Sequence, residues 1–236
     1  MKSLVIGDVH GRSVWEEIPE LLTFDRVVFL GDYFDAKEDI SEEKQIANFL
    51  KILNLKNSNP EKVTLLTGNH DLHYFPFSEN VFSGFSQGLY YSISEMMHEA
   101  YQNGVLEAVC LINHFLITHA GVTKTWFTEK IGNPEKLPLE EINESIAKLW
   151  SISPKAFGFD NRAGAWPDGD NIFQSPFLVR PGSLNRDRIP HCIHVIGHTQ
   201  VQKITMMGNN LILCDALGYS REALIIRDSK IMVMEF

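Results

Sequence analysis

The chain has 236 residues, 44% of them hydrophobic and 22% charged, and its formal net charge is −9. A chain of this size can bury an apolar core by itself, so we expect one domain over residues 1–236. The acidic balance disfavours long nucleic acids and anionic membranes as partners, because both are polyanions. No apolar stretch approaches the roughly 20 residues of a membrane-spanning helix, and no leader segment is visible. The three cysteines form no CxxC pair, so we expect a soluble, cytoplasmic protein with reduced thiols.

Five short apolar runs predict β-strands that are buried on both faces. They cover residues 4–6, 26–30, 63–67, 115–117 and 193–196. Three further runs close the chain, at residues 211–214, 223–226 and 231–233. Turn residues lie at 208–210 and 228–230, so we expect these last runs to form an antiparallel meander.

Helices are predicted between the strands. Ser41 is a candidate N-cap, and apolar residues follow it at helical spacing, namely Ile46, Phe49, Leu50 and Leu53. Pro138 can start a second helix, whose apolar face consists of Ile142, Ile146 and Leu149. A third helix is expected between residues 92 and 101. Alternating strands and helices followed by strands predict an α/β fold of two mixed sheets packed together, with helices outside.

Each of the five early strands ends in a short segment with polar side chains. The segments are Gly7-Asp8-Val9-His10-Gly11, Gly31-Asp32-Tyr33-Phe34-Asp35, Gly68-Asn69-His70-Asp71, Thr118-His119-Ala120-Gly121 and Gly197-His198-Thr199. Strand ends in α/β sheets are where ligand sites are built. Rigid strands can hold ligands from distant parts of a chain in one place. The five segments therefore predict one shared site.

The side chains in these segments suit a pair of divalent metals, which lie roughly 3.5–4 Å apart in two-metal sites and share a bridging carboxylate. Asp8 and His10 are two residues apart, so on a strand both would point to one face. Asp32 ends the next strand and can bridge. The remaining ligand candidates are Asn69, His119 and His198. A lone Gly-Asp is usually a turn and a lone His is usually structural, but five such segments in order favour a metal site.

The segments and their order resemble the calcineurin-like metallophosphoesterase superfamily over nearly the whole chain. The first two segments are similar to the phosphoprotein phosphatase branch, and residues 68–73 and 118–123 resemble symmetrical diadenosine tetraphosphate hydrolases. Leu149-Trp150-Ser151, followed by Asn161-Arg162-Ala163-Gly164, resembles the phosphatase segment whose arginine holds substrate phosphate. The resemblance implies a four-layer α/β/β/α sandwich and a single metallophosphoesterase domain.

The resemblance also implies a role for each site residue. Asp8 and His10 would hold the first metal, and Asp32 would bridge. The second metal would be held by Asn69, His119 and His198. His70 would be the general acid, Asp35 would orient it, and Arg162 would bind the phosphate. The cofactors would be two divalent ions, with Mn²⁺ the first choice and Fe, Zn, Ni or Co the alternatives.

Two positions depart from the phosphatase pattern. Ala36 stands where an arginine normally follows the second aspartate, so one phosphate-binding guanidinium is missing and Lys37 is at best a point charge. Gln200 stands where many wider superfamily members place another metal-ligating histidine, so we expect water there. We interpret Arg180, Arg186 and Arg188 as solvated loop charges. The aromatic residues of 73–91 favour ordinary packing over a wall beside the site.

The function predicted from these observations is hydrolysis of phosphomonoesters by direct attack of a metal-bridging hydroxide, without a covalent intermediate. The substrate would be a phosphorylated small molecule, a nucleotide or a phosphoprotein, with no membrane partner. Symmetrical dinucleoside polyphosphate hydrolysis is the alternative, and a phosphodiesterase comes third. A non-catalytic scaffold is disfavoured because His70 and the ligand set are present.

Overall fold

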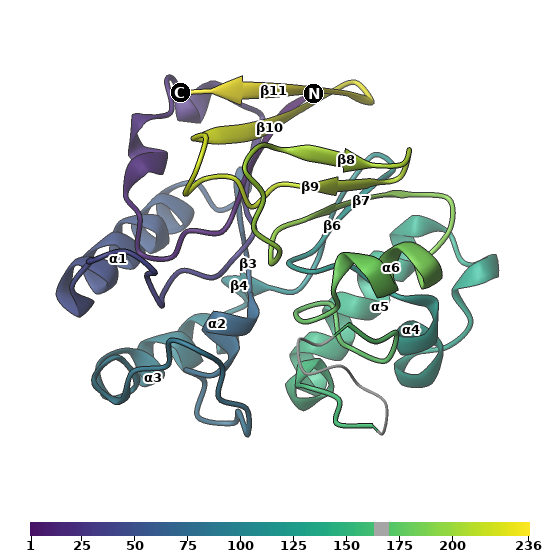
Figure 1. Cartoon of the computed structure of the whole chain (residues 1–236), viewed down its shortest axis with the longest axis horizontal. Coiled ribbons are helices and arrows are strands. Elements are labelled where there is room, and N and C mark those ends of the chain that lie inside the picture. The colour runs from purple at the N-terminus through teal and green to yellow at the C-terminus, as the bar shows by residue number, and fades with distance from the viewer. Residues whose placement is uncertain (163–169) are drawn as a thin grey trace.

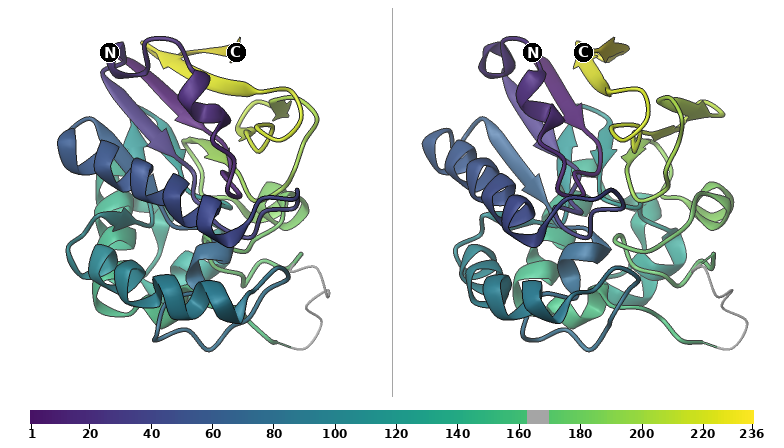
Figure 2. Two further views of the ribbon diagram at one scale, coloured as in Figure 1. Left: turned by 90° about the vertical axis from the view of Figure 1, so that its left-hand side faces the viewer. Right: turned by 60° about the vertical axis from the view of Figure 1, so that its left-hand side comes forward.

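The computed structural model describes residues 1–162 and 170–236. Two mixed β-sheets pack face to face with helices on their outer sides, as Figures 1 and 2 show. This arrangement confirms the predicted α/β fold. Within the described residues, no helix combines the length and the apolar character that crossing a bilayer requires. All three cysteines are buried and unpaired, as expected.

The first sheet has six strands in the order β11-β10-β1-β2-β3-β4. Its members are β1 (Lys2–Ile6), β2 (Arg26–Phe29), β3 (Val63–Leu66), β4 (Leu106–Glu107), β10 (Glu222–Arg227) and β11 (Lys230–Glu235). Strands β1 to β4 run parallel, so their carboxyl ends meet at one edge. Strand β10 pairs antiparallel with β1 and with β11.

The second sheet has five strands in the order β5-β6-β7-β9-β8. Its members are β5 (Cys110–Ile112), β6 (Phe115–Ile117), β7 (Ile193–Ile196), β8 (Thr205–Met207) and β9 (Leu211–Leu213). The expected three-stranded meander at the end of the chain is wrong in part. β9 pairs parallel with β7, whereas β10 and β11 form a hairpin in the other sheet. The connection over 214–221 is long enough to cross between sheets, and β9 gains burial on both faces.

Six α-helices occur in the described residues. They are α1 (Glu42–Ser58), α2 (Asn69–Leu72), α3 (Gln87–Gln102), α4 (Lys124–Lys130), α5 (Leu139–Ile152) and α6 (Pro181–Asp187). Short 3-10 turns cover Val14–Glu17, Leu21–Thr23, Pro134–Lys136 and Pro154–Phe157. Ser41 caps α1 as predicted, because its hydroxyl accepts the Lys44 N–H. Helices α1 and α3 lie beside the six-stranded sheet, and α4 to α6 lie on the side of the five-stranded sheet (Figure 1).

The alternating side chains of the strands fill three separate cores, two of which involve the six-stranded sheet. In β1, Leu4 and Ile6 face the helix-covered side, whereas Val5 faces the space between the sheets. Val28 of β2 points into the same space. Because both faces of these strands are buried, their sequences read as continuous apolar runs. The packed strands give the loops at their carboxyl ends a rigid base.

Candidate metal centre

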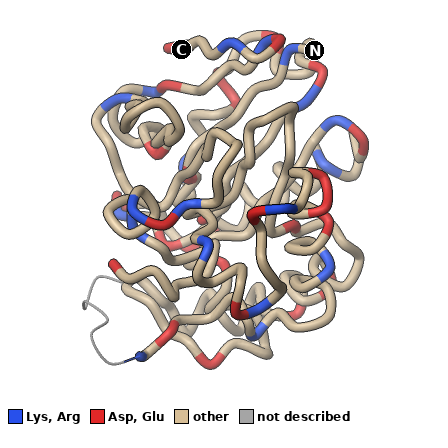
Figure 3. The backbone as a smooth tube through the Cα atoms, turned by 90° about the vertical axis from the view of Figure 1, so that its right-hand side faces the viewer, with Lys and Arg blue, Asp and Glu red and all other residues tan. Residues whose placement is uncertain are grey.

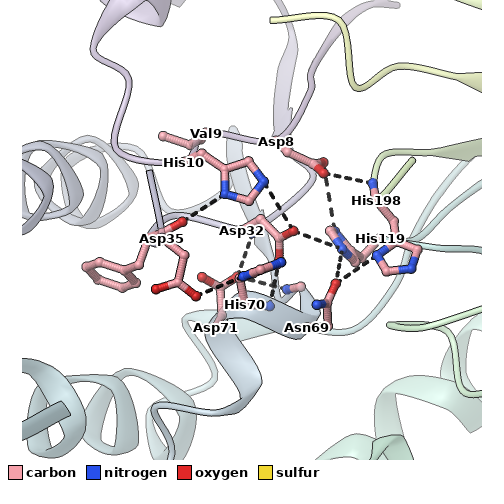
Figure 4. A network of polar contacts seen from close by, with 12 residues as sticks. Asp8, Val9, His10, Asp32, Asp35, Asn69, His70, Asp71, His119 and His198 are labelled. Atoms are coloured by element: carbon pink, nitrogen blue, oxygen red, sulfur yellow. Dashed lines mark hydrogen bonds and ion pairs between the residues drawn. The ribbon is translucent and has the colours of Figure 1, made fainter. Parts of the chain in front are cut away.

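The five loops that follow β1, β2, β3, β6 and β7 converge on one site at the edge of the two sheets (Figure 4). The structure brings together all six side chains that the sequence suggested as metal ligands. These are Asp8, His10, Asp32, Asn69, His119 and His198. All six residues are buried or nearly so. The site therefore needs both sheets in place before its groups meet.

Asp32 lies at the centre of the cluster. Its Oδ2 atom is 3.6 Å from His10 Nε2 and 3.4 Å from His119 Nε2. Possible ligand atoms of Asp8, His10 and Asp32 lie within 4.8 Å of one another. A second group of the same compactness joins Asp32 to His119 and His198. Two ligand groups thus share one carboxylate, which is the arrangement of a bridged metal pair.

Asn69 completes the second group with its amide oxygen. Asn69 Oδ1 lies 2.7 Å from His198 Nδ1 and 3.2 Å from His119 Nε2. His119 Nδ1 lies 2.8 Å from the Leu30 carbonyl oxygen and donates to it, which leaves Nε2 as a bare lone pair. The Nε2 lone pair of His119 and the Oδ1 atom of Asn69 are then two acceptors that face each other. A cation between them reconciles these contacts.

His10 is oriented in the same way. Its Nδ1 donates to the Phe34 carbonyl oxygen at 2.9 Å, so the lone pair on Nε2 faces Asp32. Burial lowers the pKa of His10 to about 4, and burial also lowers the pKa values of His119 and His198. All three imidazoles are therefore neutral near pH 7, which is the form that binds a metal.

Carboxylates crowd together on the side of the first group. Asp8 Oδ1 is buried and accepts no hydrogen bond, and Asp215 Oδ1 is in the same condition. Burial raises the pKa of Asp8, and the nearby charges of Asp215 and Asp32 raise it further. Such crowding favours a bound cation. The donor set thus fits divalent metals, with hard oxygens and imidazoles as ligands. Sequence reasoning missed Asp215, although it follows the apolar run of β9.

Several site residues adopt left-handed backbone angles. The φ values are 43° for His10, 51° for Asp32, 59° for Asp35 and 59° for His198. Non-glycine residues rarely adopt this region, and such strain tends to gather at functional sites. A Cβ atom at Gly68 would collide with Asp32 Oδ1, and one at Gly197 would collide with Asp8 Oδ1. The motif glycines therefore give the ligands room.

Asp71 joins two of the site loops. Its carboxylate accepts the N–H groups of Asp32 at 2.7 Å, Tyr33 at 2.8 Å and Gly68 at 2.8 Å. Asp71 is fully buried, so these bonds fix the loop after β2 against the loop after β3. The segment Gly68-Asn69-His70-Asp71 contains this residue, but the sequence predicts no role for it. Two of its three partners, Asp32 and Tyr33, are 39 and 38 residues away, and the motif alone does not reveal them.

His70 and Asp35 form a hydrogen-bonded pair beside the ligands, as the resemblance implied. His70 Nδ1 lies 2.8 Å from Asp35 Oδ2, and the His70 N–H donates to Asp32 Oδ1 at 2.9 Å. Burial alone would lower the pKa of His70, but Asp32 and Asp35 raise it above its ordinary value. His70 therefore carries a proton more readily than an isolated imidazole.

A cleft of about 520 Å³ opens directly beside these groups. Its lining consists of Asn69, His70, Glu79, Asn80, Val81, Phe82, Ser83, Phe159, Asn161, Leu178, Arg180 and His198. The interpretation of Arg180 as a solvated loop charge is wrong, because Arg180 is partly buried and lines the cleft. Its Nη1 atom donates to the His198 carbonyl oxygen at 3.1 Å and to Thr199 Oγ1 at 3.3 Å.

Arg162 occupies a different position. Its guanidinium is held by Glu129 and Asp160, with both shortest contacts at 2.6 Å, and lies over the Phe173 ring. Asn161 reaches the cleft lining, whereas Arg162 does not. Ala163 and Gly164 of the predicted phosphate segment lie outside the described residues. The neighbouring aspartate and glutamate mean that Arg162 must exchange partners before it can meet a phosphate.

The comparisons with known proteins agree with this geometry. A family model described as calcineurin-like phosphoesterase matches residues 1–202. None of the curated protein sequences matches the chain. A cold-active protein-tyrosine phosphatase of the psychrophile Shewanella sp. has a similar structure, with a TM-score of 0.58 at 17% identity over 99% of this chain and 77% of that chain. A serine/threonine phosphatase from Saccharomyces cerevisiae gives 0.57 at 16% identity over 100% and 79%.

Proposed function

Because the chain belongs to the calcineurin-like phosphoesterase family, we propose that it hydrolyses phosphomonoesters with the help of two divalent metal ions. The observation that supports this proposal most is the sharing of Asp32 between two ligand groups, next to the His70–Asp35 pair. Phosphomonoesters come first because both solved structures named above are protein phosphatases. We propose Mn²⁺ as the ion, with Fe, Zn, Ni and Co as alternatives.

The chemistry divides between the ions and the protein. Asp8, His10 and Asp32 would hold one ion, and Asp32, Asn69, His119 and His198 would hold the other. Bound there, the ions would supply an activated water for attack on phosphorus and positive charge to offset the phosphate. His70 stands at the cleft edge and delivers a proton to the leaving oxygen. Asp35 holds the opposite ring nitrogen, which keeps the donating nitrogen turned toward the cleft. Asp32 Oδ1 also accepts the backbone N–H of His70, so the acid and the bridging carboxylate keep a fixed relation.

Phosphate binding has two candidate arginines. Arg180 lines the cleft and is fixed by His198 and Thr199, whose loop also carries a metal ligand. We propose Arg180 as a phosphate-binding residue because a guanidinium can offer two parallel N–H groups to two phosphate oxygens. Arg162, the candidate from the sequence, stays a second proposal, since substrate would have to draw it from Glu129 and Asp160.

A substrate screen with added Mn²⁺ tests the proposal. We expect p-nitrophenyl phosphate and a phosphopeptide to be hydrolysed at least about 100-fold faster than bis-p-nitrophenyl phosphate, because two negative oxygens of a monoester can meet the cations. Asp32→Ala should lose the activity, whereas Asp39→Ala, which alters an exposed carboxylate, should keep it. Faster diester hydrolysis, or no hydrolysis by the metal-loaded wild type, would contradict the proposal.

The cleft volume favours one alternative substrate class. About 520 Å³ is more than a phosphate group fills, and Phe82 and Phe159 are aromatic surfaces in its lining. A nucleobase stacks well on such rings. Symmetrical diadenosine tetraphosphate therefore belongs in the same screen. A kcat/KM for this compound above that of every monoester would replace the proposed phosphomonoesterase with a dinucleoside polyphosphate hydrolase.

A further inference from the structure

The carboxylate of Asp35 has more partners than the general acid alone. Its Oδ2 atom meets His70 Nδ1 at 2.8 Å. His73 Nε2 lies 2.7 Å from the same oxygen, although it is not aligned for a hydrogen bond. The Tyr74 hydroxyl donates to the other oxygen, Oδ1. Both oxygens of Asp35 are thus held, which fixes the plane of the carboxylate that orients His70.

Backbone N–H groups of residues 82 and 86 determine which atoms donate in these contacts. Ser86 N–H donates to the Tyr74 hydroxyl at 3.2 Å, so the single Tyr74 proton goes to Asp35. Phe82 N–H donates to His73 Nδ1 at 3.2 Å, so Nδ1 is the acceptor and the single ring proton of neutral His73 is on Nε2, on the side of Asp35. Tyr74 is fully buried, and its ring stacks on Phe85 at 5.5 Å.

The segment that supplies these N–H groups is also a wall of the cleft. Residues 79–83 line the cleft, and the side chain of Val81 is 69% exposed there. Gly84 has a φ of +91°, and a Cβ atom on it would lie 2.9 Å from Asp35 Cβ. The backbone therefore runs directly against the acid pair. One hydrogen-bonded unit contains the cleft wall, Tyr74, His73 and Asp35.

We propose that residues 79–86 form the leaving-group wall of the active site, and that Tyr74 couples this wall to the His70–Asp35 pair as a positioning residue. The proposal rests on the proposed function in taking His70 as the proton donor. Val81 and Phe82 give the wall an apolar surface, so it suits leaving groups with an apolar or aromatic part. A leaving group bound on this wall meets the acid in a position that Tyr74 has fixed.

Tyr74→Phe tests the coupling, because it removes only the hydroxyl and keeps the stacked ring. With phenyl phosphate, a poor leaving group, kcat should fall about tenfold, a fraction of the 10²–10⁴-fold that general acid catalysis supplies. With p-nitrophenyl phosphate, kcat should fall less than about twofold, since that leaving group hardly needs a proton. The same substitution in an Asp35→Asn background should cause little further loss. Tyr101→Phe is the matched control, because its hydroxyl bonds Trp150 and Ser151 instead.

Equal losses on both substrates, or additive losses in the double variant, would overturn the positioning role. Amide hydrogen exchange adds a measurement that needs no catalysis. Ser86 N–H loses its acceptor in Tyr74→Phe, so residues 79–86 should exchange faster, and unchanged exchange would also overturn the coupling. His70→Ala in the same assay separates the two proposals: equal loss on both substrates there removes the acid role itself, while the exchange result still judges the coupling.

A separate variant tests whether residues 79–86 form the leaving-group wall. Val81→Ser shortens an exposed apolar side chain in the cleft lining and adds no charge that would repel the phosphate. KM for phenyl phosphate should rise about tenfold, the usual size of one lost apolar contact, and KM for methyl phosphate should stay unchanged. The same rise in KM for both substrates, or no rise for either, would remove residues 79–86 from the leaving-group side.

Discussion

At the level of single residues, substitution of His70 should affect the rate of hydrolysis without affecting metal binding. His70 follows Asn69 directly but uses its ring to contact Asp35, so His70→Ala should retain both metals and the fold. We expect kcat to fall about 10²–10⁴-fold on phenyl phosphate and clearly less on p-nitrophenyl phosphate. Metal content, measured on the same samples, confirms that the site is loaded. An equal loss on the two substrates would refute the acid role.

Arg180 and Arg162 differ in how easily each can bind the phosphate of a substrate. Arg180 already lines the cleft, whereas Arg162 is engaged by two carboxylates. A hydrogen bond to a charged group contributes about 1.5–3 kcal/mol, so Arg180→Ala should lower kcat/KM about 10- to 150-fold. Arg180→Lys should recover only part of this, because an ammonium lacks the two-pronged contact. We expect a smaller loss in Arg162→Ala.

Steady-state kinetics on phosphopeptide and p-nitrophenyl phosphate decide between the two arginines. Metal content must be determined for Arg180→Ala, since Arg180 also supports the loop of His198. A larger loss in Arg162→Ala than in Arg180→Ala would show that substrate draws Arg162 into the cleft. That outcome would support the alignment with the phosphatase segment and displace Arg180.

At the level of elements, the strands that carry the site were predictable because each is a near-continuous apolar run that glycine or threonine ends. The short strands β4, β5 and β8 were not predicted. β4 has only two residues, and β8 is a largely exposed edge strand without a buried apolar run. Helix α3 begins at Gln87 rather than near residue 92. The missed signal is Ser86, whose hydroxyl accepts two backbone N–H groups at the helix start. Leu50, expected on the buried face of α1, is 43% exposed.

The residues of the site also fall into those that the sequence predicts and those that it does not. The metal-ligand candidates stand next to strand ends, so their convergence follows from the sheet. Asp71, Tyr74 and Arg180 gain their roles only from contacts across the fold. The Tyr74 hydroxyl meets Asp35 across 39 residues, and Arg180 meets the loop of His198 across 18. A local pattern carries no record of such pairs, which is why aromatic packing was favoured for residues 73–91.

Asp71 should hold the loops after β2 and β3 together. Asp71→Ala leaves three backbone N–H groups without their acceptor, and a buried unsatisfied donor costs about 1–3 kcal/mol. We expect the free energy of unfolding in urea to fall by about 3 kcal/mol or more. Asp25→Ala is the control, because Asp25 accepts one backbone N–H at an exposed position and should cost less than about 1 kcal/mol. Similar losses in both variants would contradict this role.

For the whole molecule, metal binding should be coupled to folding. The candidate ligands span residues 8 to 198, so an unfolded chain cannot gather them, and the ions bind only the folded state. At 100 times the dissociation constant one bound ion stabilises the fold by about 2.7 kcal/mol. Mn²⁺ should therefore raise Tm and a chelator should lower it again. Charged residues of both signs are interspersed along the chain (Figure 3). The net charge is nevertheless −9, so a cation can also act by screening, and a variant that removes the binding site separates the two effects.

Asp32→Ala should abolish most of this stabilisation, because both ligand groups contain Asp32. Asp39→Ala should keep it in full. Thermal unfolding with and without Mn²⁺ gives the comparison directly. A Tm increase of the same size in Asp32→Ala as in the wild type would mean that the ions bind elsewhere.

We propose that two ions held by the ligand groups that share Asp32 make the protein a phosphomonoesterase. Titration of Mn²⁺ into chelator-stripped protein, with bound metal and p-nitrophenyl phosphate hydrolysis followed together, tests it most directly. We expect two ions per chain, with hydrolysis rising mainly as the second ion binds. Full hydrolysis with one bound ion, or none with two, would contradict the account.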